Sequence, residues 1–566
     1  MKTIKRLFSF ILPAVFAAAI MFSSCSESSA PADQQGDSGN TKESSGALKD
    51  SPAGQVSQCT SVVPKNALAV GNIDLGSIWN KGEFDNFKNL STIRKGLEEL
   101  KREEPNAARL VEGILNNPLS CGLNVKDNIV GFVTKDGNNT FFAASALMYN
   151  INDFEGFLNK LAAIDGSEEV LNGETIHEDG ITYMIFKRLI VAYNEKRLLF
   201  VTTNNYRMSM DYMKFYTSNL FNHESKNSIA QVSSFREYWN NRGDMSAWGS
   251  LKNIMSYSLK MKDLDDILPK EMLVGITNLS AYCTFTFENG DLALRLNTIG
   301  MPENIKGLTA HRFNSSLIKY MPGNTLAAAT LSLNPANIIN LISQLAGKDD
   351  PMNESIGINN YKVKDVVNAF GGSFAASFFG MVDDEIPAVA IAADITNLNI
   401  ITNIIEQVGF TKNGDLFTIP SLPFALCIKG NVIIASTDMS VLNKDIEGGY
   451  SNGLGNIADK AKDGNYVYVN LDYDRYPSEI KKIIDDELFT HYDYDYDYYT
   501  DSYEEFTYHD DEAARAFTEI MRWFRSADAR LDNNGLVVKV YTSDNNSNSL
   551  SFLINKINNL ASRQLK

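Results

Sequence analysis

The sequence predicts an α+β protein of two tandem homologous domains, each a largely antiparallel sheet with helices packed on one face. Three observations support this: short runs with alternating apolar residues, hairpin turns such as KDGNN and DNNG, and a series of segments that occurs twice in the same order. Because hairpins join most strands, neighbouring strands are expected to run antiparallel. At about 240 residues, each half is long enough to form its own core.

The duplication appears as six pairs of matching segments. Both halves open with Pro-x-Asn-x-Leu-Ala and an alternating strand, in VPKNALAVGNIDLGSI from Val63 and MPGNTLAAATLSLNPANI from Met321. Five pairs follow in the same order: LNVKDNIVGFV with YKVKDVVNAFGGSF, FFAASALMYNINDFEGFLNKL with AVAIAADITNLNIITNIIEQ, RLLFVTTNNYRMSM with NVIIASTDMSVLNK, GDMSAWGSLKNI with GNYVYVNLDYDR, and ENGDLALRLNTI with NNGLVVKVYTSD. In the third pair, NIND and DITN supply helix N-caps. The predicted repeats are 59–305 and 306–548, followed at 549–566 by a tail or short helix.

The N-terminus has the features of an export signal. Three basic residues precede the apolar run LFSFILPAVFAAAIMF, which is too short and too poorly flanked for a stable membrane span. Small residues then lead directly to Cys25, as in a bacterial lipobox, where the signal peptide 1–24 is removed and Cys25 is lipidated. The alternative is an ordinary signal peptide with an incidental cysteine.

The mature chain is expected to begin with a polar tether. Residues 25–58 are rich in Ser, Gly, Asp and Pro, which predicts a disordered segment with a reach of roughly 30 Å. Cleavage would remove three positive charges and no acids, which takes the formal charge from −17 to about −20. Such an acidic chain is not attracted to nucleic acid, so its membrane contact would come from the lipid.

Four cysteines remain after Cys25. A bridge between Cys59 and Cys121, both beside turn-forming residues, is plausible in an oxidising compartment. Four cysteines allow three pairings, and four buried thiols are the alternative. None of them has metal-binding spacing.

The Pro-x-Asn-x-Leu opening, the cysteine with its polar tether, and the repeated hairpin–helix units resemble an uncharacterised family of Bacteroides-type envelope lipoproteins. The resemblance implies an envelope location and a two-domain form, and it implies no catalytic residues, since that family has no assigned activity. The length and anchor are also similar to those of starch-binding outer-membrane lipoproteins of the same bacteria. Those are predominantly helical, and the strand-rich duplicated pattern departs from them.

Motifs of catalysis are weak. Gly449 to Gly453 satisfies Gly-x-Ser-x-Gly, but the sequence before it predicts a helix end and a loop, whereas a nucleophile elbow needs a strand. Arg242-Gly243-Asp244 spells an adhesion tripeptide, yet its context predicts an ordinary turn entering a strand. The five histidines show no metal-binding pairing.

The stretch HYDYDYDYYTDSYEEF, His491 to Phe506, lies in an insertion at about 485–512 of the second repeat. Long insertions in a compact scaffold are usually functional or disordered. One hypothesis is a calcium loop between two helices, because oxygen ligands at alternate positions, closed by a glutamate, suit a hard cation. The candidate ligands are Asp493, Asp495, Asp497, Asp501 and Glu504. Against it, Tyr498 stands where the motif needs glycine.

Two other interpretations of this stretch remain open. An extended backbone would place the aspartates on one face and a set of tyrosines on the other. Such tyrosines suit recognition of a protein or glycan; they are Tyr492, Tyr494, Tyr496 and Tyr498. The last interpretation is a solvated, mobile acidic loop.

Taken together, the sequence predicts an exported lipoprotein of the outer membrane, facing the periplasm or the surface. Its expected function is non-catalytic binding or assembly, with an unknown protein or glycan as partner and no cofactor other than possible calcium. The alternative is an envelope hydrolase with a site between the two repeats. A deep cleft that gathers carboxylates or a histidine would favour the hydrolase, whereas an exposed aromatic patch would favour binding.

Overall fold

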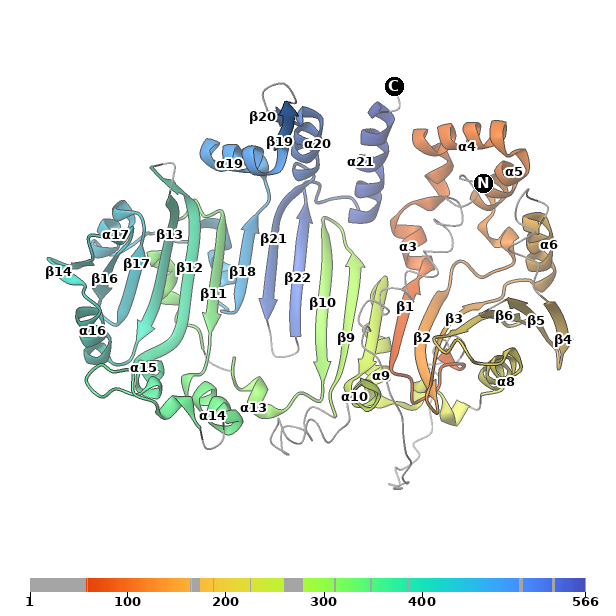
Figure 1. Cartoon of the computed structure of the whole chain (residues 1–566), viewed down its shortest axis with the longest axis horizontal. Helices are drawn as coiled ribbons and strands as arrows, with labels where there is room; N and C mark the ends of the chain where they lie inside the picture. Colours follow the sequence, from red (N-terminus) through yellow and green to blue (C-terminus); the bar gives the residue numbers. More distant parts are fainter. Residues whose placement is uncertain are drawn as a thin grey trace. The chain divides into compact units, whose positions relative to one another are not determined.

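The computed structural model describes residues 58, 60–162, 164, 174–186, 188–223, 225–258, 278–309, 312–346, 349–383, 386–497, 502–531 and 535–564 (Figure 1). The chain divides into two compact units. The first holds the described residues up to 258 together with 278–287 and 550–564, and the second holds 288–549. Both units mix helices with an antiparallel sheet, so the α+β class is confirmed.

The sheet of the first unit has the strand order β9–β8–β1–β2–β3–β7–β6–β5–β4, and every neighbouring pair is antiparallel. Its described strands are β1 (Ala69–Asp74), β2 (Asn128–Asp136), β3 (Asn139–Leu147), β4 (Glu174–Glu178), β5 (Ile181–Phe186), β6 (Leu189–Tyr193), β7 (Arg197–Thr203), β8 (Met245–Ser250) and β9 (Ser280–Phe287). Its described helices are α3 (Leu75–Lys81), α4 (Ser91–Glu103), α5 (Pro105–Asn116), α6 (Ile151–Ala162), α8 (Met210–Phe221), α9 (Ser233–Asn240), α10 (Leu251–Ser258) and α21 (Ser549–Gln564).

The sheet of the second unit has the order β10–β22–β21–β18–β11–β12–β13–β17–β16–β15–β14, again antiparallel throughout (Figure 1). Its described strands are β10 (Asp291–Ile299), β11 (Ala327–Ser332), β12 (Phe370–Val382), β13 (Ile386–Ile395), β14 (Thr411–Asn413), β15 (Leu416–Thr418), β16 (Ala425–Lys429), β17 (Val432–Ser436), β18 (Tyr466–Asn470), β21 (Phe524–Leu531) and β22 (Gly535–Thr542). A separate hairpin joins β19 (Thr490–Asp497) to β20 (Ser502–His509). Its described helices are α13 (Glu303–Lys306), α14 (Pro335–Ala346), α15 (Val363–Ala369), α16 (Leu398–Gln407), α17 (Met439–Ile446), α18 (Ala458–Ala461), α19 (Ser478–Phe489) and α20 (Asp511–Met521).

The two sheets share one strand order. In the second unit, β21–β18–β11–β12–β13–β17–β16–β15–β14 follows the same succession along the chain as β9–β8–β1–β2–β3–β7–β6–β5–β4 in the first. The compact units do not coincide with the predicted repeats 59–305 and 306–548, however. Strand β10, which lies within the first predicted repeat, pairs with β22 inside the second unit. The C-terminal helix α21 belongs to the first unit, where Asn558 accepts hydrogen bonds from Ser91 and Thr92 at the start of α4.

Helix starts follow the caps that the sequence contains. Asn150 accepts hydrogen bonds from the backbone N–H of Asn152 and Asp153 at the start of α6. Asn397 accepts one from the N–H of Ile400 in α16. These side chains satisfy N–H groups that no helical carbonyl can reach, so the N-caps predicted from NIND and DITN are confirmed.

The prediction that helices pack on one face of each sheet is wrong. In the second unit, Ile401 and Ile405 of α16 pack against Phe417 and Leu426 on one side of the sheet. Helix α17 packs through Val441 and Leu442 with a cluster that includes several small residues of the strands on the other side: Ala375, Ala390, Ala392, Ala425 and Cys427. The periodicity of a strand shows which residues share a face, but it does not show how many faces are covered.

Candidate functional site

The Asp/Tyr stretch forms a β-hairpin between two helices. Helix α19 ends at Phe489, strand β19 begins at once, and β20 returns to the start of α20 (Figure 1). The flanking helices are those the sequence predicts, but the single loop of a helix–loop–helix calcium motif is absent from the described backbone. Tyr and Thr dominate alternate positions here, and such residues favour extended structure.

The hairpin register places the predicted site residues. Asp493, Asp495 and Asp497 occupy alternate positions of β19, and Asp495 stands opposite Glu504 of β20. Tyr492, Tyr494 and Tyr496 take the intervening positions of the same strand. The remaining two predicted residues, Asp501 and Tyr498, lie outside the described residues.

The base of the hairpin is held by a histidine between two carboxylates. His509 Nε2 lies 3.0 Å from Asp485 Oδ2 of α19, and Nδ1 lies 2.8 Å from Asp511 Oδ1 of α20. The hydrogen bond to Asp511, with that to Asp485, raises the pKa of His509 above 6.5. The protonated imidazole can therefore donate to both helices at once.

This arrangement predicts a pH dependence of the hairpin base. Because the folded pKa of His509 is raised, the stabilisation is fully present below the unfolded pKa and is lost as pH rises through the folded pKa. An NMR titration of the imidazole should give a pKa above 6.5, and Asp511→Asn should lower it. Glu479→Gln, at the opposite end of α19 in its first turn, serves as the control. An imidazole pKa that Asp511→Asn leaves unchanged would contradict the assignment.

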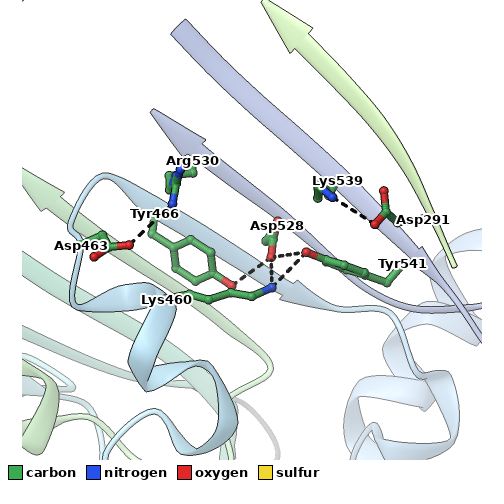
Figure 2. Close-up of polar contacts among 8 residues, drawn as sticks. All are labelled: Asp291, Lys460, Asp463, Tyr466, Asp528, Arg530, Lys539 and Tyr541. Atoms are coloured by element: carbon green, nitrogen blue, oxygen red, sulfur yellow. Dashed lines mark hydrogen bonds and ion pairs between the residues drawn. The ribbon is translucent and has the colours of Figure 1, made fainter. Parts of the chain in front are cut away.

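A second cluster lies on the sheet of the second unit (Figure 2). Asp528 Oδ2 of β21 accepts from three groups: Lys460 Nζ of α18 at 2.6 Å, the Tyr541 hydroxyl of β22 at 3.1 Å and the Tyr466 hydroxyl of β18 at 3.3 Å. Lys460 Nζ also lies 3.0 Å from the Tyr541 hydroxyl. We call these four residues the polar network: Lys460, Tyr466, Asp528 and Tyr541.

Burial and charge act together on the polar network. Burial, reinforced by the Asp528 carboxylate, raises the pKa of the Tyr466 phenol strongly, so that it remains a hydrogen-bond donor. Partial burial lowers the pKa of Lys460, but its bonds to Asp528 and Tyr541 outweigh this and leave it raised. Two further ion pairs flank the network, Lys539 with Asp291 at 3.1 Å and Arg530 with Asp463 at 3.6 Å (Figure 2).

The first unit has aromatic rings at the corresponding place. Trp248 of β8 stands opposite Tyr282 of β9, as Tyr468 stands opposite Asp528 in the second unit. Phe235 of α9 packs edge-on against Trp248, with ring centroids 5.6 Å apart. The shared strand order therefore does not require a charged network at this position.

The polar network predicts unequal mutational effects. Asp528→Ala should destabilise the protein by about 2–3 kcal/mol, since it leaves the buried Tyr466 hydroxyl without its acceptor. Lys460→Met should cost less than about 1 kcal/mol, because the lysine side chain is 52% exposed. Thermal unfolding of both variants checks this. Equal losses would mean that the ion pair, and not the tyrosine hydrogen bond, carries the stability.

The opposite face of the same sheet is apolar and open. One row of directly paired residues crosses seven strands, from β13 to β10: Ile391, Ala376, Ala329, Val467, Ala529, Val538 and Leu294. The next row is Val389, Phe378, Ala327, Val469, Ala527, Val540 and Leu292. Since directly opposite residues share a face, both rows lie on one side, which we call the open face. Six large apolar side chains are exposed on it: Leu296, Leu331, Ile391, Val467, Val469 and Leu531.

On β10, β22 and β21 the usual exposure of the two sheet faces is reversed: the face with the charged residues is the more covered one, and the apolar face is the more exposed one. Asp291, Lys539, Asp528 and Arg530 alternate with the apolar residues, so the charges gather on the side of the polar network. An antiparallel sheet normally turns its charged face to water and its apolar face to a core. Here the apolar face remains exposed, with Leu296 of β10 at 43% and Leu531 of β21 at 40%. A contiguous apolar patch of this kind marks an interaction site more often than a scattered surface leucine does.

The other sequence motifs take structural roles. Asp244 of the Arg-Gly-Asp tripeptide is buried and paired with Lys81, so its carboxylate is not offered to a partner. The Gly-x-Ser-x-Gly stretch forms a loop after α17 and is not an elbow after a strand. Cys121 is buried, and its Sγ lies 3.0 Å from the Pro118 carbonyl oxygen. Cys59 and Cys25 lie outside the described residues, so the bridge and the lipid attachment stay predictions.

Among the side chains that the structure describes, which do not include those of residues 491–508 in the hairpin, no three of His, Cys, Asp or Glu are grouped to hold a metal ion. No helix in the described part of the chain is long and apolar enough to cross a bilayer.

The fold thus defines a mixed helix-and-sheet protein with a large antiparallel sheet. The chain belongs to the family described as a domain of unknown function, DUF4836, whose model matches residues 59–519. A comparison with curated proteins gives no match. Among solved structures the chain is similar to TP0453 in crystal form III (9% identity, covering 67% of this chain and 92% of that one, TM-score 0.18) and in crystal form I (10%, 69% and 98%, TM-score 0.17). Likeness at these TM-scores carries no information about fold or function.

Proposed function

We propose that this protein is a lipid-anchored component of the cell envelope, built as two tandem homologous domains, and that it acts by binding or assembly without catalysis. The apolar run that leads to Cys25 and the polar tether after it support the anchor. The common strand order of the two units, together with the six matching sequence segments, supports the duplication. An outer-membrane location is part of the proposal.

The observation that carries the binding role is the open face of the second unit. Within the two rows described above, every side chain is aliphatic or aromatic, and the strands' backbone groups are used in the sheet. Such a face offers area but no hydrogen bonds, so its partner presents an apolar surface. Covering Val467 or Leu331 with a partner removes apolar area from water, which is favourable by roughly 25 cal/mol per Å2.

The proposal is tested with an apolar dye, 8-anilinonaphthalene sulfonate, whose fluorescence rises when it binds exposed apolar surface. The chain from residue 25 with Cys25→Ser should bind the dye while fully folded. Val467→Lys should reduce dye binding several-fold, because it places a charge in the middle of the open face.

Val408→Lys is the matched control, since Val408 is 54% exposed in the same unit but lies at the end of α16. Two results would overturn the binding role of the open face. One is an equal reduction of dye binding by Val408→Lys and Val467→Lys, and the other is a folded chain that does not bind the dye. The anchor has its own test: palmitate label should enter the wild-type chain and be lost in Cys25→Ser.

We also propose the hairpin β19–β20 as an accessory site, for calcium or for recognition through its tyrosines. Its register supports calcium, because acidic Asp495 and Glu504 stand directly opposite each other. Like charges at opposite positions destabilise a strand pair, and a divalent cation would relieve this.

A calcium titration of thermal unfolding tests the accessory site. Calcium at about a hundred times its dissociation constant should stabilise the chain by about 2.7 kcal/mol. The variant with Asp493→Ala and Glu504→Ala should show no shift. If the wild type is also unchanged, the hairpin does not bind calcium, and Tyr494→Ala then tests recognition by tyrosine.

A further inference from the structure

We infer that the occupant of the open face is a second copy of this chain, packed face to face through the same unit. The inference rests on the proposed function, because it names the partner of the surface proposed there. It assigns a weak, reversible homodimer in which the apolar sheets of two copies form one buried layer.

The first support is self-complementarity of the face. The valines of β18 form a ridge, since Val467 stands between Ala329 and Ala529 in one row, and Val469 stands between Ala327 and Ala527 in the next. The small alanines on both sides leave two shallow grooves in the surface, one along β11 and one along β21, which we call the alanine tracks. In a two-fold dimer the same patch meets itself, so the ridge of each copy can enter an alanine track of the other. Sheets that pack face to face interdigitate in this way, about 10 Å apart.

The second support is the direction of the two tracks. Strands β11 and β21 both run antiparallel to β18, so they are parallel to each other. Each track ends at an exposed leucine of its own strand, Leu331 or Leu531, so the two alanine tracks are closed at the same end. The two leucines therefore limit how far one copy can slide along the strands of the other, so they fix the relative position of the two copies.

The area of the face sets the expected affinity. Across the seven strands the patch spans six spacings of about 4.8 Å each, and along the strands it spans two two-residue repeats of about 6.8 Å each. The product is an area on the order of 400 Å2, measured between backbone positions. Stable complexes bury about 800 Å2 per partner, so this face suits a transient contact.

The face carries no charge, although the chain as a whole carries −17, so copies meet where like-charge repulsion is lowest. Anchoring both copies in one membrane would raise their effective concentration.

The test is analytical ultracentrifugation of the chain from residue 25 with Cys25→Ser, at concentrations below and above about 10 μM. Dye binding is measured on the same samples. A reversible dimer is expected, and dye bound per chain should fall as the dimer forms, because association covers the open face. Val467→Lys should weaken association by about a hundredfold or more, since it buries an unpaired charge at the contact. Leu331→Lys should act in the same direction, and Val408→Lys should associate as the parent chain does.

The outcomes separate this inference from the proposed function. A chain that stays monomeric while it still binds the dye overturns the second copy but leaves the open face as a binding site. Displacement of the dye by palmitate would then assign the face to lipid acyl chains. A dimer that survives both Val467→Lys and Leu331→Lys uses another surface and also overturns the inference. A folded chain without dye binding at any dilution removes the proposed binding surface and the dimer together.

Discussion

Asp445→Asn is expected to make the protein more stable at pH 8 by up to about 4 kcal/mol. Asp445 lies in α17 with 0% of its surface exposed, and neither carboxylate oxygen has a hydrogen-bond partner among the described residues. Burial raises its pKa from 3.8 to about 7. Each pKa unit corresponds to about 1.36 kcal/mol, so ionising this acid in the folded state is expensive, and an amide avoids that charge.

The pH profile gives the sharper test of Asp445. Between pH 4 and pH 7 the folded state holds a proton that the unfolded state has released, so the stability of the wild type should fall as pH rises and level off above pH 7. Urea unfolding at pH 5 and pH 8 should show a larger advantage of Asp445→Asn at pH 8. Glu447→Gln, an exposed acid at the end of the same helix, is the control. An advantage of equal size at both pH values would show that Asp445 is not a buried acid with a raised pKa.

Asp244→Ala is expected to cost about 3–5 kcal/mol, because it removes a buried carboxylate and leaves the partly buried Lys81 ammonium without its partner. The Asp244 side chain is 3% exposed, and its carboxylate lies 2.8 Å from Lys81 Nζ. It also accepts from the Ser77 hydroxyl at 2.5 Å and from the backbone N–H of Phe287 at 2.6 Å. One carboxylate thus joins α3, the turn before β8, and the end of β9.

Thermal unfolding measures the loss at Asp244, with Glu237→Ala on the exposed side of α9 as the control, expected within about 0.5 kcal/mol of wild type. Lys81→Met should cost less than Asp244→Ala, since the carboxylate keeps its two other donors. If Asp244→Ala behaves like Glu237→Ala, the ion pair does not contribute to stability.

The functional surfaces differ in how visible they are in the sequence. The alternation of Asp528 and Arg530 with alanines, and of Lys539 with valines, already indicates strands with one charged and one apolar face. The partner of Asp528 could not be predicted, because Lys460 lies 68 residues away on a short helix. Asp445 gave no signal either, since an aspartate in a helical segment usually faces solvent, and only the packing of α17 against β16 buries it. The alternation of aspartate and tyrosine is visible in the sequence, but only the structure shows that the described backbone, 490–497 and 502–509, pairs as a hairpin.

By itself the sequence determined the α+β class and the caps at Asn150 and Asn397, because periodicity, turn residues and capping act over a few neighbouring positions. The tertiary structure alone decided which sheet faces are covered, that β10 pairs with β22, and that α21 packs on α4. These contacts join residues far apart in the chain, and their free energy depends on burial that no local pattern records. The exposure of Val467 and its neighbours, on which the proposed function depends, is a property of this long-range packing.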